Sequence, residues 1–178
     1  LNLAEGKPIS LDKSSILIDK HGEFKFTFIK FCLRYLFSTK STKDSIKVDL
    51  KNEISAQIDN YIRLINNDDY PLYIDSHTHF HMIPMIFKII TDLIEKYKIK
   101  YIRIPEEKYF FSKSNIRMYF SLNTLKHILL NFLSKINRLK LKKFPHCKQT
   151  SYFIGVLFSG KMTVSSIDNA LAKIVKEK

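Results

Sequence analysis

The stretch with the most chemically reactive side chains is Asp75–His81, which reads DSHTHFH. Asp75, His77, His79 and His81 are spaced two apart, and side chains two apart on an extended strand point to the same side. On a strand all four would therefore face one cavity. Imidazoles suit zinc and related transition metals, and carboxylates also accommodate magnesium or manganese. The spacing predicts a divalent-cation site, with a polar strand end of solvated or hydrogen-bonded histidines as the alternative.

The segments around this motif predict a strand, a helix and a second strand. A short apolar run at residues 72–76 follows Pro71, hydrophobic residues recur at helical spacing over 83–97, and a second β-prone run at 100–104 ends at Pro105. In α/β sheets and barrels, ligands bind at the carboxyl ends of the strands. The histidine-rich motif occupies that position.

Hydrophobic periodicity assigns the rest of the chain to a similar alternation. We predict extended segments at 1–4 and 152–158 and an extended or loop segment at 13–19. We predict helices at 24–37, 44–65 and 164–175, and a helical insertion over about 112–142. Strands that alternate with helices favour a largely parallel α/β arrangement. The chain has no internal repeat and no low-complexity linker, so we predict a single domain over 1–178.

Composition is ordinary except for charge. The 178 residues suffice for one substantial core, and 45% hydrophobic and 26% charged residues are typical of globular proteins. A net charge of +13 can indicate nucleic acid, anionic lipid or acidic polysaccharide as a partner. The Lys and Arg residues are scattered along the chain and do not form one block. We therefore interpret the net charge as a bias in overall amino-acid composition and not as a binding surface. We predict no nucleic-acid partner, and leave open weak binding to anionic surfaces and a homodimer.

The sequence has neither a long apolar segment nor a pattern of closely spaced cysteines. No window reaches the roughly 18 to 20 apolar residues of a membrane span, which predicts no integral membrane contact. Cys32 and Cys147 are too far apart to suggest a disulfide framework. A reducing, cytoplasmic location is the default expectation.

Two motifs together resemble a known family. The segments DSHTHFHMIP (75–84) and YIRIPEE (101–107) resemble the core signature of the YdjC-like carbohydrate deacetylases, which include chitooligosaccharide deacetylase and members associated with hopanoid biosynthesis. LNLAEGKPIS (1–10), Glu53 with Gln57, and FIGVLFSG (153–160) are similar to further family segments in the same order. The resemblance implies an incomplete, distorted TIM-like (β/α) barrel with largely parallel strands. It also implies a metal-dependent hydrolase that removes acetyl groups from N-acetylated amino sugars, a small carbohydrate substrate.

The chain also departs from the family pattern. The family has an Asp-Asp pair and a His before the segment that matches 1–10, and a His-Pro-Gly segment after the helix that matches 164–176. This chain contains neither. We therefore expect an internal fragment of the domain, truncated at both ends, whose activity is not to be presumed.

The resemblance assigns roles within the histidine-rich motif. His77 matches a metal ligand of the family, with magnesium the expected ion and zinc the alternative. We predict that Asp75 takes part in catalysis by orienting an imidazole, because a coordinated His usually passes its other ring proton to an acceptor. His79 and His81 are predicted to bind substrate, with a hydrogen-bond network at the strand end as the alternative.

Arg103 is the second predicted catalytic residue. At the mouth of the next strand its guanidinium could hold a carboxylate or sugar hydroxyls. A structural ion pair to Glu106 or Glu107 is the alternative, although an exposed loop is the default expectation for both glutamates.

Two other functions stay open on the sequence. The Asp-Ser-His-Thr-His segment also resembles the His-x-His of amidohydrolases and barrel-type phosphoesterases. There the motif normally lies on the first strand, with ligands downstream, whereas the only later histidines here are His127 and His146. A catalytically inactive remnant is the second alternative, and metal titration would distinguish it.

Overall fold

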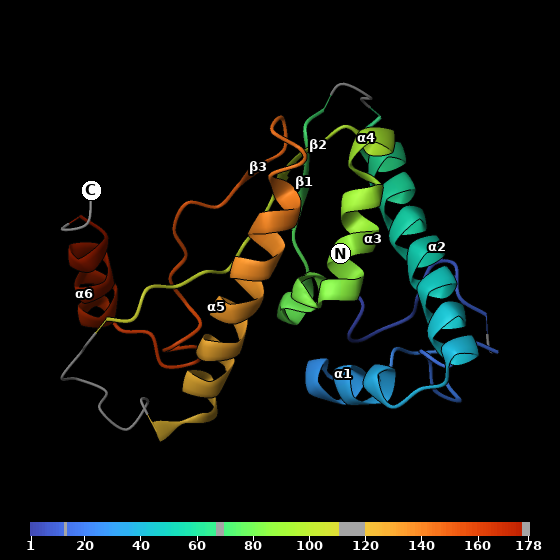
Figure 1. Cartoon of the computed structure of the whole chain (residues 1–178), viewed down its shortest axis with the longest axis horizontal. Coiled ribbons are helices and arrows are strands. Elements are labelled where there is room, and N and C mark those ends of the chain that lie inside the picture. Colours follow the sequence, from blue (N-terminus) through green and yellow to red (C-terminus); the bar gives the residue numbers. More distant parts are fainter. Residues whose placement is uncertain (13, 67–69, 111–119, 176–178) are drawn as a thin grey trace. The chain divides into compact units, whose positions relative to one another are not determined.

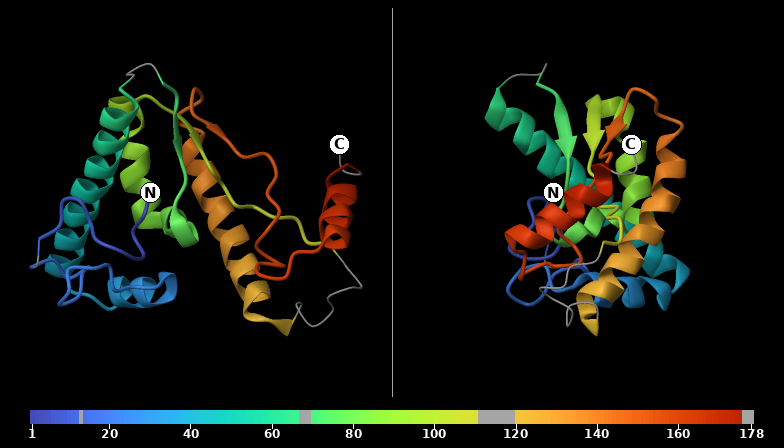
Figure 2. Two further views of the ribbon diagram at one scale, coloured as in Figure 1. Left: turned by 180° about the vertical axis from the view of Figure 1, so that it is seen from behind. Right: turned by 90° about the vertical axis from the view of Figure 1, so that its left-hand side faces the viewer.

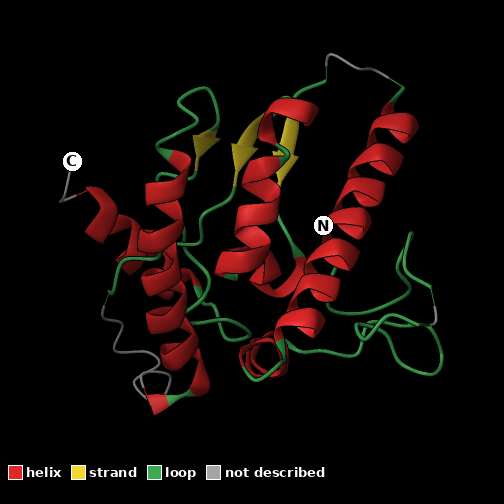
Figure 3. Ribbon diagram, turned by 45° about the vertical axis from the view of Figure 1, so that its right-hand side comes forward, coloured by secondary structure: helices red, strands yellow, loops and turns green. Residues whose placement is uncertain are grey.

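A computed structural model describes residues 1–12, 14–66, 70–110 and 120–175. The chain forms two compact units, Leu1–Tyr101 and Ile102–Lys178, which we call unit 1 and unit 2. Helices and loops make up most of the described residues, and the strands are short (Figure 3). The predicted α/β class is confirmed; the barrel and the single domain stay predictions.

Unit 1 contains the histidine-rich motif. Its elements, in chain order, are α1 (Phe28–Leu36), α2 (Lys40–Ile65), β1 (Leu72–Ile74), the 3₁₀ helix η1 (His77–Met82), α3 (Pro84–Asp92), α4 (Ile94–Tyr97) and β2 (Ile99–Ile102), which ends at the first residue of unit 2. The residues before α1 form turns with one isolated antiparallel bridge, Ile18 to Phe24.

Helix α2 supplies one wall of the unit 1 core. Ile46, Leu50, Ile54 and Ile58 recur every four residues, so they share one face, and each is at most 2% exposed. This face packs against α3, which lies alongside α2 in Figure 1 and in the left view of Figure 2. The Thr39 hydroxyl caps the helix by accepting from the Thr42 amide at 3.3 Å.

The predicted helix at 83–97 is divided in two. Pro84 occupies the first turn of α3, where its missing N–H costs nothing. At Leu93 the backbone leaves helical hydrogen bonding with φ −96° and ψ −5°, and α4 follows as a single turn that ends at Lys98 in the left-handed conformation. The buried Leu93 and Ile94 side chains explain why the sequence periodicity runs on through the break.

In its described residues, unit 2 consists of one long helix, one short helix and extended loops. α5 (Leu122–Leu141), β3 (Lys148–Gln149) and α6 (Val164–Val175) are its elements. The predicted insertion at about 112–142 is helical from Leu122, and its part at 112–119 lies outside the described residues. The helix predicted at 164–175 is confirmed. The three strands form a small parallel sheet in the order β1-β2-β3.

Two extended segments predicted from the sequence are not strands. Residues 152–158 form loop and turn, because the amides of Gly155 and Leu157 donate to a buried carboxylate, that of Glu107, instead of a neighbouring strand. Residues 1–4 also lack strand structure, although Leu1 exchanges backbone hydrogen bonds with Asp75 and His77.

The described part of the chain has no helix long and apolar enough to cross a membrane. Cys32 and Cys147 are both free thiols. Burial raises the pKa of Cys147 to about 11, so it is a neutral packing group at physiological pH.

The α2 face predicts a clear difference between two substitutions on one helix. Ile54→Ala removes a side chain that is 0% exposed and should lower the free energy of unfolding by about 2–5 kcal/mol. Val48→Ala, at a position 57% exposed on the same helix, should change it by less than about 0.5 kcal/mol. Urea denaturation followed by circular dichroism measures both; equal effects would contradict the assigned core.

Candidate functional site

The histidine-rich motif turns into a helix instead of continuing the strand. β1 ends at Ile74, and η1 begins at His77. Inside η1, Thr78 (φ 52°) and His79 (φ 61°) have left-handed backbone conformations. The expectation that residues 75–81 form a strand with four side chains on one side is therefore wrong.

The apolar side chains of this turn are buried. Phe80, Met82 and Ile83 are at most 4% exposed. The Phe80 ring lies against two rings of α1, with centroids 5.9 Å from Phe28 and 5.8 Å from Phe31. These ring contacts pack η1 against α1.

The left-handed backbone conformations of Thr78 and His79 are energetically unfavourable. The conformation is uncommon for residues other than glycine, and most of all for a β-branched residue such as Thr78. Backbone strain of this kind typically costs about 1–3 kcal/mol and clusters at active sites, ligand clamps and switch regions. The strain lies between His77 and His81 and sets the direction of each imidazole separately.

His77 is the exposed imidazole of the motif and has an acidic partner. Its side chain is 52% exposed, and its Nε2 lies 2.9 Å from Oε1 of Glu5. A carboxylate only accepts hydrogen bonds when ionised, so this contact assigns a proton to Nε2. Such a pairing fixes the tautomer and leaves Nδ1 as the ring nitrogen with a lone pair.

His81 is instead a buried part of the loop. It is 0% exposed. The Ser76 hydroxyl oxygen accepts from the His81 backbone N–H at 2.9 Å and lies 2.7 Å from its Nδ1. A hydroxyl has one proton, and donating it to Nδ1 satisfies both groups. The Ser76 side chain therefore links the start of the turn to His81 near its end.

His79 lies next to His81, with ring centroids 6.4 Å apart, and is half-buried. The structure thus brings His79 and His81 together and pairs His77 with Glu5. Among the described residues, no group of three or more His, Cys, Asp or Glu side chains could hold a metal ion. The metal-ligand role of His77 and the substrate-binding roles of His79 and His81 stay predictions.

The first residues of the chain lie against the start of η1. The backbone nitrogen of Leu1 donates to the Asp75 carbonyl at 2.6 Å, and the Leu1 carbonyl accepts from the His77 N–H at 2.9 Å. Asp75 is half-buried beside this pair. Its catalytic role stays a prediction, and the carboxylate that contacts His77 is that of Glu5.

A buried carboxylate on α2 holds the same N-terminal segment. Glu53 is 0% exposed. Its oxygens accept from the Ile9 N–H (3.0 Å), the Ser10 N–H (2.7 Å), the Ser10 hydroxyl (2.9 Å) and the Gln57 amide (2.8 Å). A carboxylate this well supplied with donors can be buried in its charged form.

Gln57, one turn further along α2, also binds the N-terminal segment. Its Oε1 accepts from the Asn2 N–H at 2.8 Å, and its Nε2 donates to the Asn2 carbonyl at 2.6 Å. The Asn2 side chain in turn donates to the Glu5 carbonyl at 2.8 Å. This Glu53–Gln57 clamp thus fixes the loop that presents Glu5 to His77.

Arg103, the other predicted catalytic residue, belongs to unit 2. It is exposed, and its guanidinium carbon lies 5.7 Å from the Phe153 ring centroid. Neither glutamate named as its ion-pair partner is simply an exposed loop residue. Glu106 pairs with Arg138, its Oε2 lying 2.5 Å from Nε, and Glu107 is 1% exposed and binds backbone amides.

Sequence reasoning missed two residues of the site. Glu5 is separated from His77 by most of unit 1, and no local spacing links the two. Ser76 has the even parity that the strand interpretation placed on the opposite side. The signal available for Glu5 was its place in the segment LNLAEG, which resembles a family segment.

Comparison with known proteins gives the family. A family model described as YdjC-like protein matches residues 1–178, and the chain belongs to this family. The predicted resemblance is confirmed at that level.

Three curated relatives are each named carbohydrate deacetylase. The Danio rerio protein is 30% identical over 107 residues, the Xenopus laevis protein 32% over 108 and the Mus musculus protein 24% over 109. Each alignment covers 60% of this chain but only 32–33% of the relative. The chain therefore matches about a third of the relatives' length. No solved structure matches it.

The Glu53–Gln57 clamp predicts a specific loss of stability. Glu53→Gln replaces an acceptor by an N–H₂ group that faces the donors of Ile9 and Ser10, and should lower the free energy of unfolding by about 2–4 kcal/mol. Asp59→Asn, the same change at an exposed position of α2, is the matched control and should have little effect. Chemical denaturation of both variants tests this; a Glu53→Gln protein as stable as the wild type would contradict the clamp.

Proposed function

We propose that this chain is part of a carbohydrate deacetylase, which hydrolyses the N-acetyl group of an amino sugar in a small carbohydrate. Membership of the YdjC-like family and three relatives named carbohydrate deacetylase support the proposal. On this chain, the observation that supports the proposal is the exposed position of the His77 side chain. Its imidazole is exposed at the start of η1, contacts the Glu5 carboxylate and precedes the left-handed residues Thr78 and His79.

The reaction sets what the site has to do. Water attacks the acetyl carbonyl, the C–N bond breaks, acetate leaves, and the sugar keeps a protonated amine. Proton transfer to the departing nitrogen and stabilisation of the oxyanion both lower the barrier. The exposed residues near His77 are the ones that can meet a substrate, since His81 is fully buried.

We assign His77 as a ligand of a divalent cation, magnesium first and zinc as the alternative. The contact with Glu5 supports this assignment, because a metal-bound His normally gives its other ring proton to an acceptor. The described side chains alone do not complete a metal site. Further ligands would have to come from outside the described residues.

The remaining roles follow from position. We propose that His79, half-buried beside His81, contacts the sugar, and that His81 supports the turn through Ser76. Asp75 and Arg103 are proposed to act in catalysis, Asp75 beside the start of η1 and Arg103 through a guanidinium suited to carboxylates and sugar hydroxyls.

Replacing His77 tests the proposal. In the full-length protein, His77→Ala should lower acetate release from N,N′-diacetylchitobiose at least about 100-fold, because the variant removes a ligand or proton carrier at the reacting group. The side chain is 52% exposed, so the fold should be unaffected. His21→Ala, at an exposed turn, is the matched control and should keep full activity.

Assays with added magnesium or zinc, and with a chelator, belong to the same experiment. Acetate release that responds to neither would contradict the metal assignment. Unchanged turnover in His77→Ala would overturn the proposed function.

A further inference from the structure

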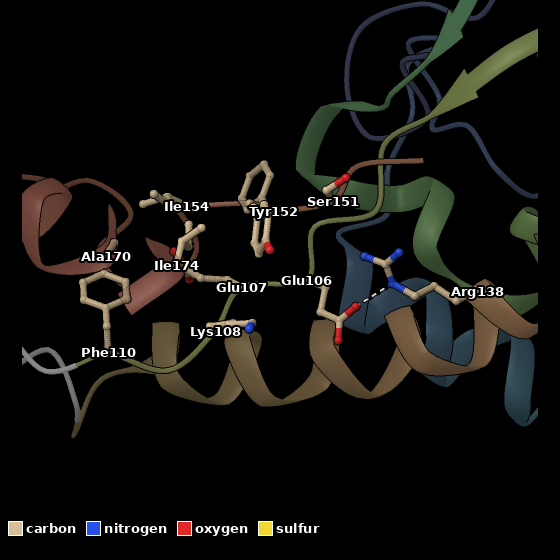
Figure 4. A pocket seen from close by; sticks show the side chains of 11 residues that line it. Glu106, Glu107, Lys108, Phe110, Arg138, Ser151, Tyr152, Ile154, Ala170 and Ile174 are labelled. Atoms are coloured by element: carbon tan, nitrogen blue, oxygen red, sulfur yellow. Dashed lines mark hydrogen bonds and ion pairs between the residues drawn. The ribbon is translucent and has the colours of Figure 1, made fainter. Parts of the chain in front are cut away.

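Unit 2 contains a cavity of 340 Å³ that the proposed function does not use. It lies between the segment after β2, the loop around Tyr152 and the helices α5 and α6 (Figure 4). Its size falls in the range of small-molecule sites, which combine apolar walls with a few fixed polar groups. Both features are present here.

One end of the cavity is polar. Glu106 and Arg138 form an ion pair, and Arg138 Nη2 also donates to the Thr150 carbonyl at 2.9 Å. Their side chains are 32% and 24% exposed, so both can be reached by a ligand. A guanidinium has five N–H donors and a carboxylate two acceptor oxygens, which leaves capacity for further hydrogen bonds.

The other end is apolar. Phe110 and Ala170 are at most 5% exposed and form a small core with Leu157 and Phe158, against which Ile154 packs. Tyr152 stands between the two ends in Figure 4, and the Lys108 ammonium lies 5.8 Å from its ring centroid. The cavity therefore combines the aromatic ring of Tyr152, an apolar end at Phe110 and Ala170, and the Glu106–Arg138 ion pair.

The walls are held by buried hydrogen bonds, so the cavity is preformed. Glu107 accepts from the amides of Gly155 and Leu157, each at 2.6 Å. Asn131 on α5 accepts from the Glu107 N–H at 2.9 Å and donates to its carbonyl at 2.8 Å. A site that is rigid before binding loses less entropy when it is filled.

We propose that this cavity binds one neutral, N-acetylated sugar ring. Sugar hydroxyls both donate and accept, so they can bridge the carboxylate of Glu106 and the guanidinium of Arg138. The C–H face of the ring can lie on Tyr152, and the acetyl methyl can enter the corner of Phe110 and Ala170. An inorganic anion fits less well, because the Glu106 carboxylate would oppose it.

The inference deepens the proposed function, on which it rests, by assigning sugar-binding residues in unit 2. These residues contribute to substrate affinity and not to bond cleavage.

Titration of the full-length protein with N-acetylglucosamine and N,N′-diacetylchitobiose, followed by NMR chemical shifts, tests the inference. Shifts should appear at the amides of Glu106, Tyr152 and Ile154. Tyr152→Ala should weaken this binding about tenfold, since an aromatic contact contributes on that scale. Tyr70→Ala, an exposed tyrosine of unit 1, is the matched control and should leave it unchanged.

Three further arms separate the outcomes. His77→Ala should keep the unit 2 shifts while losing acetate release, so failure of the cavity and failure of the proposed function are distinguishable. Glucosamine should bind several-fold more weakly than N-acetylglucosamine, because it lacks the acetyl group whose methyl would contact Phe110 and Ala170. Glu106→Gln should weaken sugar binding without unfolding the protein. Shifts with inorganic phosphate but not with the sugars, or equal binding by Tyr152→Ala and the wild type, would overturn the inference.

Discussion

Four donors converge on the carboxylate of Glu53, and the geometry around His77 depends on that arrangement. The loop of residues 1–10 has neither helix nor strand to order it. Its amides must still find acceptors, and α2 supplies them with one buried charge and one Gln side chain. An uncompensated buried carboxylate would be strongly destabilising, so the loop and the helix require one another.

The same physical solution occurs in unit 2. Glu107 is buried and accepts the amides of Gly155 and Leu157 where a sheet would have supplied neighbouring carbonyls. In both units a carboxylate takes the place of a strand partner for an irregular loop. Glu5 and Tyr152 both lie in loops whose backbone is held in this way. Rigid support of this kind is what a binding or catalytic site needs from its surroundings.

The sequence predicted the helices well because their periodicity reflects burial directly. The face of α2 and the bounds of α6 follow from spacing alone. The strands were predicted less well, since a short apolar run does not show whether a partner strand exists. Residues 152–158 look like a strand, yet Gly155 (φ 143°) and the Glu107 carboxylate divert them into a turn.

The histidine-rich motif identified the family although the geometry inferred for it was wrong. Parity along a strand predicted four converging side chains, whereas the left-handed backbone at Thr78 and His79 turns the chain, and His77 is exposed while His81 is buried. The contact between Glu5 and His77 joins residues far apart in sequence, which no local pattern encodes. Family membership was therefore predictable from the motif, but side-chain direction required the packing of α1, α2 and the first ten residues.

Hydrogen exchange at the Ile9 and Ser10 amides measures the central interaction most directly. The Ile9 side chain is 54% exposed and lies in a loop, so without the carboxylate its amide should exchange as in an unfolded peptide. The clamp predicts strong protection of both amides in the wild-type protein and its loss in Glu53→Gln. Rapid exchange at both positions in the wild type would contradict the account.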